Sequence, residues 1–214
     1  CAPCATPSGK IAANLDRHQK SRMSSAPFRL ARVHQDLDLL NTIQRGIEKE
    51  GLRVDDLGRL VQTPHPVALG SALANSRITT DYSEALLELI TGTHSSAEAV
   101  LQELEETHRY VARQLDGERI WNQSMPATLP AAADIPVGEY GHSNSGMLKH
   151  VYRLGLAERY GKRMQCIAGV HYNLSFPDQF WQDLQFPGGD LQTQRTNGYL
   201  ALIRNFTRYA WLLM

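Results

Sequence analysis

Two glutamates lie two positions apart in the segment GIEKEGLRV, residues 46–54. In a β-strand, alternate side chains leave the same face, so Glu48 and Glu50 would project together, about 7 Å apart. On a partly enclosed sheet face their repulsion grows, and a bound cation relieves it. Carboxylate oxygens favour Mg²⁺ or Mn²⁺. The pair therefore predicts a metal site, and a solvated strand face is the alternative interpretation.

Three more side chains could contribute to such a site. Asp81 and Glu88 flank an apolar run, and His171 lies in a segment of alternating polar and apolar residues. Taken alone, each is explained equally well as an ordinary polar position on a strand or at its end. Their number, on segments that could share one sheet, favours the metal hypothesis.

The common signatures of phosphate-binding loops, hydrolases and zinc proteases do not occur in the sequence. One glycine- and serine-rich segment, YGHSNSG at residues 140–146, precedes a predicted helix. Its backbone N–H groups could receive an anion. We favour a simpler interpretation, in which Ser143, Asn144 or Ser145 caps the helix.

Composition limits the class of protein. The 214 residues are enough for one domain, and the formal net charge is zero. Balanced charge gives no indication of a nucleic-acid partner, and no apolar run reaches the roughly 20 residues that span a membrane. Three cysteines, with one isolated Cys1-x-x-Cys4 pair, do not form a disulfide framework. We expect a soluble, cytoplasmic protein without nucleic-acid or membrane partners.

Both ends of the sequence are unusual. Residues 1–22 are polar, carry no periodic pattern and lack the apolar core of a signal peptide. We expect them to be an unrelated or disordered extension, with Met23 as the natural start. Residues 198–214 form an apolar-rich helical pattern with no stop signal. We expect the chain to be cut there, so that 23–214 is one portion of a larger catalytic domain.

The remaining pattern predicts mixed helices and strands. We expect a helix ending near Arg45, a hairpin that returns through LVQT, a strand over 78–91, and a helix over about 96–115 behind a Ser95-x-x-Glu98 capping box. Residues 125–136 are predicted to be loop, 146–162 helix and 165–176 strand. This order predicts an α+β fold with a mainly antiparallel sheet and helices packed on one face.

The predicted strand 165–176 has two distinct faces. Gln165 and His171 belong to a largely polar face, whereas Cys166, Val170 and Tyr172 belong to an apolar one. We expect the apolar face to pack on helices and the polar face to turn outward.

An ordered series of segments resembles a known family. GIEKEGLRV, HPVALGSAL, ITTDYSEALLELIT, YGHSNSGMLKHVYRLGLAERYG and MQCIAGVHYN are similar, in this order, to the proteobacterial glutamate–cysteine ligases, also called gamma-glutamylcysteine synthetases. The resemblance covers roughly residues 40–211. It implies a glutamine-synthetase-like fold, here incomplete, in which a curved antiparallel sheet holds metal ions and the phosphates of ATP. The chain would then be the N-terminal portion of such an enzyme.

The resemblance also implies an activity and a set of site residues. ATP would phosphorylate the γ-carboxylate of L-glutamate, and L-cysteine would displace the phosphate, in the first step of glutathione biosynthesis. The positions matching the family's Mg²⁺ or Mn²⁺ ligands are Glu48, Glu50, Asp81, Glu88 and His171. Those matching its cysteine pocket are Tyr82, Tyr152, Leu156 and Gln165. Arg53 is a candidate contact for an anionic group, although alternation places it on the face opposite Glu48.

Three alternatives stay open at this point. The enzyme could be a related carboxylate–amine ligase that joins another amine, or the chain could be a metal-binding remnant without catalysis. The portion could also be inactive alone, because half of a multi-metal site does not position both ATP and glutamate.

Asp81 and Glu88 pose a further problem for the predicted metal site. Residues seven apart in one regular strand leave opposite faces, so a bulge or bend must lie between them.

Overall fold

The computed structural model describes residues 37–213 except 127 and 185. Its described residues form two compact units, which we treat separately: Gln44–Ser175 is one, and residues 37–43 and 176–213 belong to the other. The strands are β1 (Gln44–Val54), β2 (Ile78–Thr80), β3 (Leu86–Ile90), β4 (Arg119–Trp121) and β5 (Val170–Ser175). The α-helices are α3 (Ala97–Gln114), α4 (Asn144–Tyr160), α5 (Asp178–Leu184) and α6 (Leu191–Tyr209). Short 3-10 helices are η1 (Leu37–Thr42), η2 (Val67–Leu69), η3 (Ala132–Asp134), η4 (Met164–Cys166) and η5 (Ala210–Leu212).

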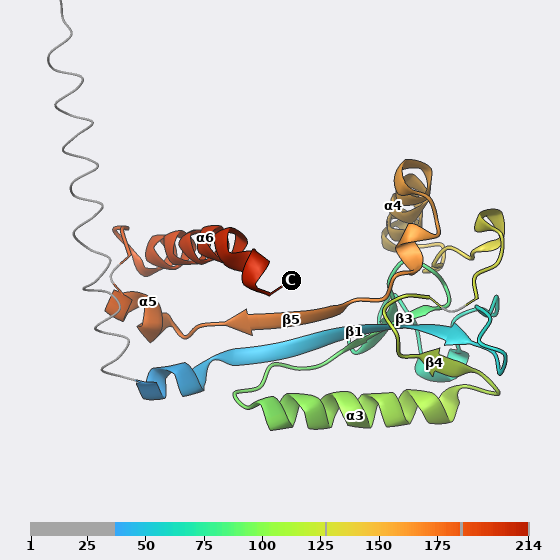
Figure 1. Cartoon of the computed structure of the whole chain (residues 1–214), viewed down its shortest axis with the longest axis horizontal. Coiled ribbons are helices and arrows are strands. Elements are labelled where there is room, and N and C mark those ends of the chain that lie inside the picture. Colours follow the sequence, from blue (N-terminus) through green and yellow to red (C-terminus); the bar gives the residue numbers. More distant parts are fainter. Residues whose placement is uncertain (1–36, 127, 185, 214) are drawn as a thin grey trace, which may run out of the picture. The chain divides into compact units, whose positions relative to one another are not determined.

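The long strand β1 is the centre of the larger unit (Figure 1). One of its edges pairs with β3, which in turn pairs with β2. Its other edge pairs with β5 along the first half and with β4 near the end. All four pairings are antiparallel, which confirms the predicted α+β class and antiparallel sheet. Gly51 allows the close approach of β4, because a Cβ there would lie 2.5 Å from Cγ2 of Ile120.

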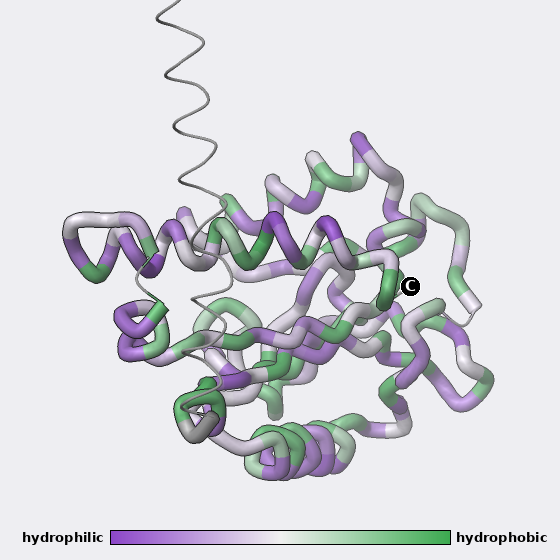
Figure 2. The backbone as a smooth tube through the Cα atoms, turned by 60° about the vertical axis from the view of Figure 1, so that its left-hand side comes forward, coloured by the Kyte–Doolittle hydropathy of each residue, from purple (hydrophilic) through white to green (hydrophobic). Residues whose placement is uncertain are grey.

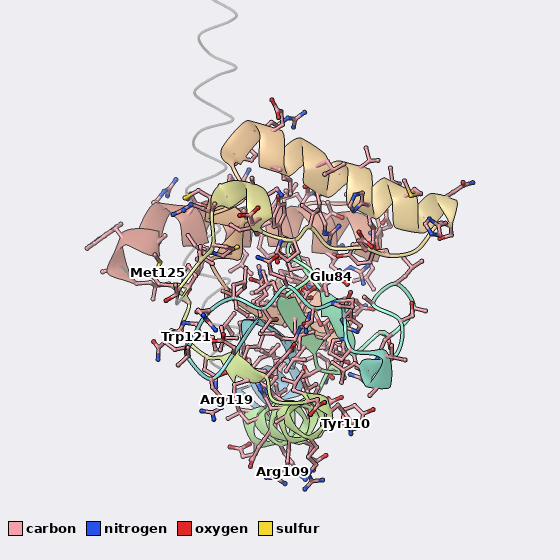
Figure 3. All side chains as sticks on the ribbon, turned by 90° about the vertical axis from the view of Figure 1, so that its right-hand side faces the viewer. Glu84, Arg109, Tyr110, Arg119, Trp121 and Met125 are labelled. Carbon is pink, nitrogen blue, oxygen red and sulfur yellow. The ribbon has the colours of Figure 1, made fainter. Side chains whose placement is uncertain are left out.

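Helix α3 runs along one face of this sheet (Figure 1). Figure 2 shows hydrophobic and hydrophilic residues alternating around it, and in Figure 3 Arg109 of α3 points away from the sheet. Its apolar side packs on a cluster formed by Leu69, Ile78, Leu87, Leu89, Val111 and Leu115. A second cluster lies on the opposite face and contains Leu52, Val54, Leu60, Val61, Ala85, Leu86, Ile135, Cys166 and Ala168. Apolar residues therefore bury both faces of β3.

Several predicted elements are correct and some have shifted bounds. α3 and α4 confirm the two predicted helices. The N-cap of α3 is Ser96, whose side chain accepts from the N–H of Ala99, and not the predicted Ser95. The N-cap of α4 is Ser143, which confirms the capping interpretation of the YGHSNSG segment.

Three predicted elements need correction. The helix predicted to end near Arg45 lies largely outside the described residues; in the described part only the 3-10 helix η1 precedes β1, which begins at Gln44 and pairs there with β5. The predicted hairpin is confirmed at its turn, where the N–H of Asp55 donates to the carbonyl of Arg59 and Leu60 pairs with Val54. LVQT does not continue as a strand, because the chain then turns so that the carbonyls of Thr63 and Pro64 meet the Arg53 guanidinium. The region 78–91 contains two strands, β2 and β3, instead of one.

The predicted strand 165–176 begins only at Val170, because Met164–Cys166 forms a 3-10 turn. Its apolar face is not covered within the described residues: Val170 is 65% exposed and Tyr172 57%. The expected packing of this face on helices is therefore wrong here, because α3 lies against β1 and β3 rather than against β5.

The smaller unit is organised around aromatic side chains. Trp181 of α5 is buried, and its ring centroid lies 4.5 Å from that of Tyr199 and 5.9 Å from that of Phe186. No described helix in either unit is long and apolar enough to cross a membrane. The extension over 1–22, including the Cys1-x-x-Cys4 pair, lies outside the described residues.

Candidate functional site

Glu48 and Glu50 lie on the central strand β1. Register places Glu50 directly opposite Glu88 of β3, and Glu48 directly opposite His171 of β5. Directly paired residues of antiparallel strands project from the same sheet face. The structure therefore brings four predicted site residues from three strands onto one face.

A short hairpin adds Asp81 to this face. Thr79 is opposite Glu88, and two residues later the N–H of Asp81 donates to the carbonyl of Leu86 at 3.0 Å. Because alternate residues share a face, Asp81 follows Thr79 onto the side of Glu88. The turn between β2 and β3 supplies the bend that the sequence required between Asp81 and Glu88.

The carboxylates of β1 are held by neighbours from the β5 segment. Glu50 is 9% exposed; its Oε2 accepts from the N–H of Gly169 at 2.7 Å and its Oε1 lies 3.2 Å from Nε2 of His171. Oε1 of Glu48 accepts from Nδ2 of Asn173 at 2.9 Å. Gly169 and Asn173 were not predicted as site residues. Asn173 could have been found, since it shares the strand parity of His171.

Burial raises the pKa of two carboxyls on this face, and neighbouring negative charges add to the effect. Burial raises the pKa of the Glu88 carboxyl to about 6, and the charges of Asp81, Glu48 and Glu50 add to the shift. Burial also raises the pKa of Asp81, with the charge of Glu50 acting in the same direction. The positive charge of Arg153 acts against this second shift. The acidic face is therefore a place where an added cation would be stabilised.

The four carboxylates fit a divalent cation in chemical type, since carboxylate oxygens suit Mg²⁺ or Mn²⁺. Their positions are a separate question. Among the described residues, no group of three or more His, Cys, Asp or Glu side chains is arranged as a ready ligand set. The structure thus shows a shared acidic face and not a finished coordination sphere.

The residues matched to a cysteine pocket lie on three segments. Tyr82 follows Asp81 and is 1% exposed, and its hydroxyl is buried without a hydrogen-bond partner in the described part of the chain. Tyr152 and Leu156 lie one helical turn apart on α4, the first exposed and the second half-buried. Gln165 lies in η4, so its predicted place on one strand face with His171 is wrong.

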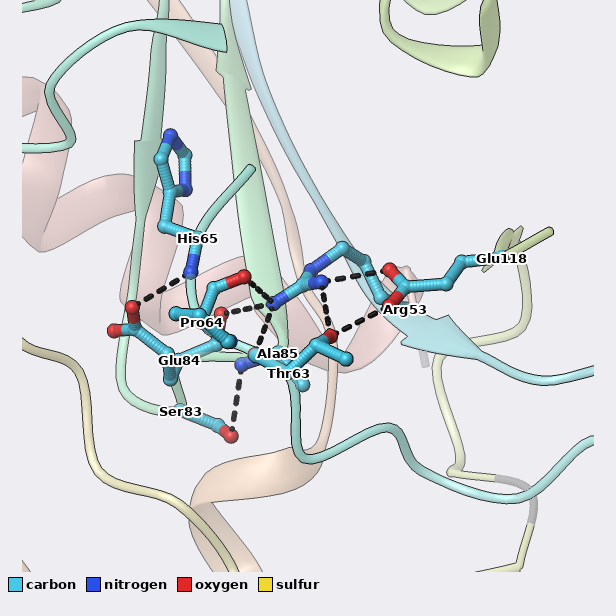
Figure 4. Close-up of polar contacts among 8 residues, drawn as sticks. All are labelled: Arg53, Thr63, Pro64, His65, Ser83, Glu84, Ala85 and Glu118. Atoms are coloured by element: carbon cyan, nitrogen blue, oxygen red, sulfur yellow. Dashed lines mark hydrogen bonds and ion pairs between the residues drawn. The ribbon is translucent and has the colours of Figure 1, made fainter. Parts of the chain in front are cut away.

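Arg53 lies on the other face of β1 and is fully buried, and Figure 4 shows its polar contacts. Its Nη1 is 2.6 Å from Oε2 of Glu118 and donates to Oγ1 of Thr63. Its Nη2 donates to the carbonyls of Thr63, Pro64 and Glu84. These contacts give the guanidinium a structural role, and the anion contact stays a prediction that the geometry does not favour.

Comparisons with known proteins agree on one family. A family model described as glutamate-cysteine ligase matches residues 29–214. The glutamate–cysteine ligase of Bordetella petrii is 67% identical over 190 residues, which are 89% of this chain and 36% of that protein. That of Pseudomonas putida is 57% identical over 189 residues, covering 87% of this chain and 36% of the relative.

Solved structures point the same way. The glutamate–cysteine ligase of Francisella tularensis in complex with AMP aligns with a TM-score of 0.73 at 40% identity, covering 80% of this chain and 34% of that one. A bifunctional glutathione synthetase from Pasteurella multocida aligns with a TM-score of 0.75 at 33% identity, covering 86% of this chain and 24% of that one. The chain spans about 36% of the length of the curated relatives it matches.

Proposed function

The chain belongs to the glutamate–cysteine ligase family, and from this premise we propose that it contributes the acidic sheet face of an enzyme that joins L-cysteine to L-glutamate at the expense of ATP. The γ-carboxylate oxygen of glutamate attacks the γ-phosphorus of ATP and releases ADP. The amine of cysteine then attacks the acyl phosphate, loses a proton and releases phosphate. The product, γ-glutamylcysteine, starts glutathione synthesis, which we place in the cytoplasm, where thiols stay reduced.

The observation that carries this proposal is the convergence of carboxylates across β1, β3 and the β2–β3 turn. We assign Mg²⁺, with Mn²⁺ as a substitute, to the residues Glu48, Glu50, Asp81, Glu88 and His171. The support is the register that brings these side chains onto one face, together with the raised pKa of Glu88 and Asp81, which burial causes first and neighbouring carboxylates increase. Such a cation would neutralise the ATP phosphates and the charge that develops on the transferred phosphoryl group.

The protein groups around these carboxylates orient them. The Gly169 N–H donates to one oxygen of Glu50, and the Asn173 side-chain amide donates to one oxygen of Glu48. The second oxygen of Glu50 lies beside His171, so the orientation of that carboxylate is determined from two sides. Fixed orientation matters because ligands that are held in place by neighbouring groups bind metal more tightly.

We assign the amine acceptor to the region of Tyr82, Tyr152, Leu156 and Gln165. Leu156 offers apolar surface, which suits the small, weakly polar thiol side chain of cysteine. The unpartnered hydroxyl of Tyr82 favours one second candidate, a ligase whose acceptor amine carries a polar side chain. A buried hydroxyl without a partner is costly, so a ligand that satisfies it gains affinity.

Metal binding is the first test. Calorimetry with Mn²⁺ on the chain itself is compared with the double variant Glu48→Gln/Glu50→Gln. A matched control, Glu105→Gln/Glu106→Gln, removes the same charge from the outer side of α3. We expect the first variant to lose binding and the control to keep it. Equal binding in all three proteins would remove the acidic face from the proposal.

Activity is the second test. We would join this chain to the parts of the Bordetella petrii relative that it does not match, and measure ADP release. The proposal requires release that depends on both glutamate and cysteine. Release with a polar amine in place of cysteine would favour the second candidate, and release without any amine would contradict both.

A further inference from the structure

The turn that carries Asp81 is hydrogen-bonded to side chains from outside the sheet. The Tyr140 hydroxyl donates to the carbonyl of Thr80 at 2.7 Å and accepts from Oγ1 of Thr80 at 2.9 Å. From helix α4, Nε of Arg153 donates to the main-chain carbonyl of Asp81. Two neighbouring residues of the turn thus have their backbone fixed by groups distant in sequence.

Arg153 is itself held in one orientation. Its guanidinium lies over the ring of Tyr140, 4.6 Å from the centroid, and Nη1 donates to the carbonyl of Lys149 at 3.0 Å. The Tyr140 ring is 6% exposed and so offers a fixed platform. Stacking on an aromatic face sets the plane of a guanidinium, and therefore the direction of its Nε–H.

We propose that Arg153, seated on Tyr140, is a positioning residue that fixes the main chain at Asp81 and so keeps its carboxylate on the face of Glu50 and Glu88. The inference deepens the proposed function and rests on it for its consequence. Because α4 also carries Tyr152 and Leu156, the same contact joins the acceptor region to the acidic face.

Charge and positioning predict opposite effects on cation binding. A guanidinium near Asp81 repels an incoming cation, so removal of the charge alone would tighten binding. Removal of a contact that positions a metal ligand weakens binding. A lysine keeps the charge but lacks the planar stack and the Nε–H donor. The two explanations can therefore be separated with two substitutions at one position.

The functional test measures Mn²⁺ affinity of the chain by calorimetry. We expect Arg153→Lys and Arg153→Met each to weaken binding about tenfold, as loss of a group that orients a metal ligand does. Arg159→Met, in the last turn of the same helix, is the control and should leave the affinity unchanged. Unchanged affinity in Arg153→Lys with tighter binding in Arg153→Met would overturn the proposal, because only charge would then matter.

Amide hydrogen exchange tests the positioning without any metal. The N–H of Asp81 donates to Leu86 and that of Gly138 to Tyr82, so both report the order of the turn. We expect both amides to exchange faster in the two Arg153 variants and at the wild-type rate in the Arg159 control. Unchanged exchange at both amides would overturn the proposal.

Two outcomes keep the proposal separate from the proposed function. Faster exchange in the variants, together with no Mn²⁺ binding by the unaltered chain, would support the positioning role and reject the metal assignment. If Arg153→Met does not fold, Arg153→Lys alone carries the test, since it keeps the charge and the alkyl stem and removes the Nε–H donor to Asp81. Faster exchange of Asp81 in Arg153→Lys would support the proposal, and unchanged exchange would overturn it.

Discussion

Replacing Arg53 by methionine should destabilise the larger unit strongly. The substitution keeps an apolar side chain of similar length and removes every contact of a guanidinium that is fully buried. The carboxylate of Glu118, whose side chain is 14% exposed, loses its cation at 2.6 Å. The carbonyls of Thr63, Pro64 and Glu84 lose a donor at the same time.

The magnitude follows from these losses. Removing one partner of a buried ion pair costs about 3–5 kcal/mol, because the other charge remains buried and unpaired. Both Arg53→Met and Arg53→Met/Glu118→Met leave the carbonyls without donors, at about 1–3 kcal/mol for each that stays buried and unsatisfied, but only the single variant also leaves a buried, unpaired charge. The double variant should therefore be more stable than Arg53→Met alone.

Equilibrium urea unfolding, followed by circular dichroism, measures both free energies of unfolding. Arg119→Ala is the control, since its ion pair with Asp56 is exposed on both sides and should contribute less than about 1 kcal/mol. A loss below about 1 kcal/mol in Arg53→Met would refute the reasoning, because the network could not then be buried and mutually dependent.

Three more predictions follow from local features. The pKa of Glu88 is raised from 4.5 to about 6, so the folded state favours its neutral form. Ionised Glu88 therefore lowers the free energy of unfolding above pH 6, and this effect is absent below pH 4.5, where the carboxyl is neutral in both states. Glu88→Gln should raise the urea midpoint at pH 8 and leave it unchanged at pH 4. Gly146→Ala should lower the melting temperature, because its Cβ would lie 2.4 Å from a carbonyl oxygen, whereas Gly155→Ala, which meets no atom within 4 Å, should raise it. Ser96→Ala should cost about 1 kcal/mol in urea unfolding and Ser95→Ala almost nothing.

Local periodicity was enough for part of the candidate site. Alternation alone placed Glu48 and Glu50 on one strand face, and Arg53 on the other, as the structure has them. Helical spacing likewise placed Tyr152 and Leu156 one turn apart. These relations depend only on residues near each other in sequence, where the geometry of one element determines the answer.

Periodicity failed where the end of an element depends on a distant partner. The alternating pattern continued back to Gln165, yet the strand begins at Val170, because Met164–Cys166 forms a 3-10 turn and β4 pairs with β1 from Leu52 onward. The region 78–91 reads as one apolar run, but the turn at Asp81 divides it when β2 folds back on β3.

The sequence by itself determined the residue types, their faces and the resemblance to a ligase family. Only the tertiary structure decided that Glu50 faces Glu88, that Glu48 faces His171, and that Arg153 reaches the backbone of Asp81. The physical reason is register: a shift of one residue between two strands reverses every face, and long-range packing selects among the possible registers. The same packing surrounds Arg53 with protein acceptors, and on the opposite face it places carboxylates close enough to raise the pKa of Glu88.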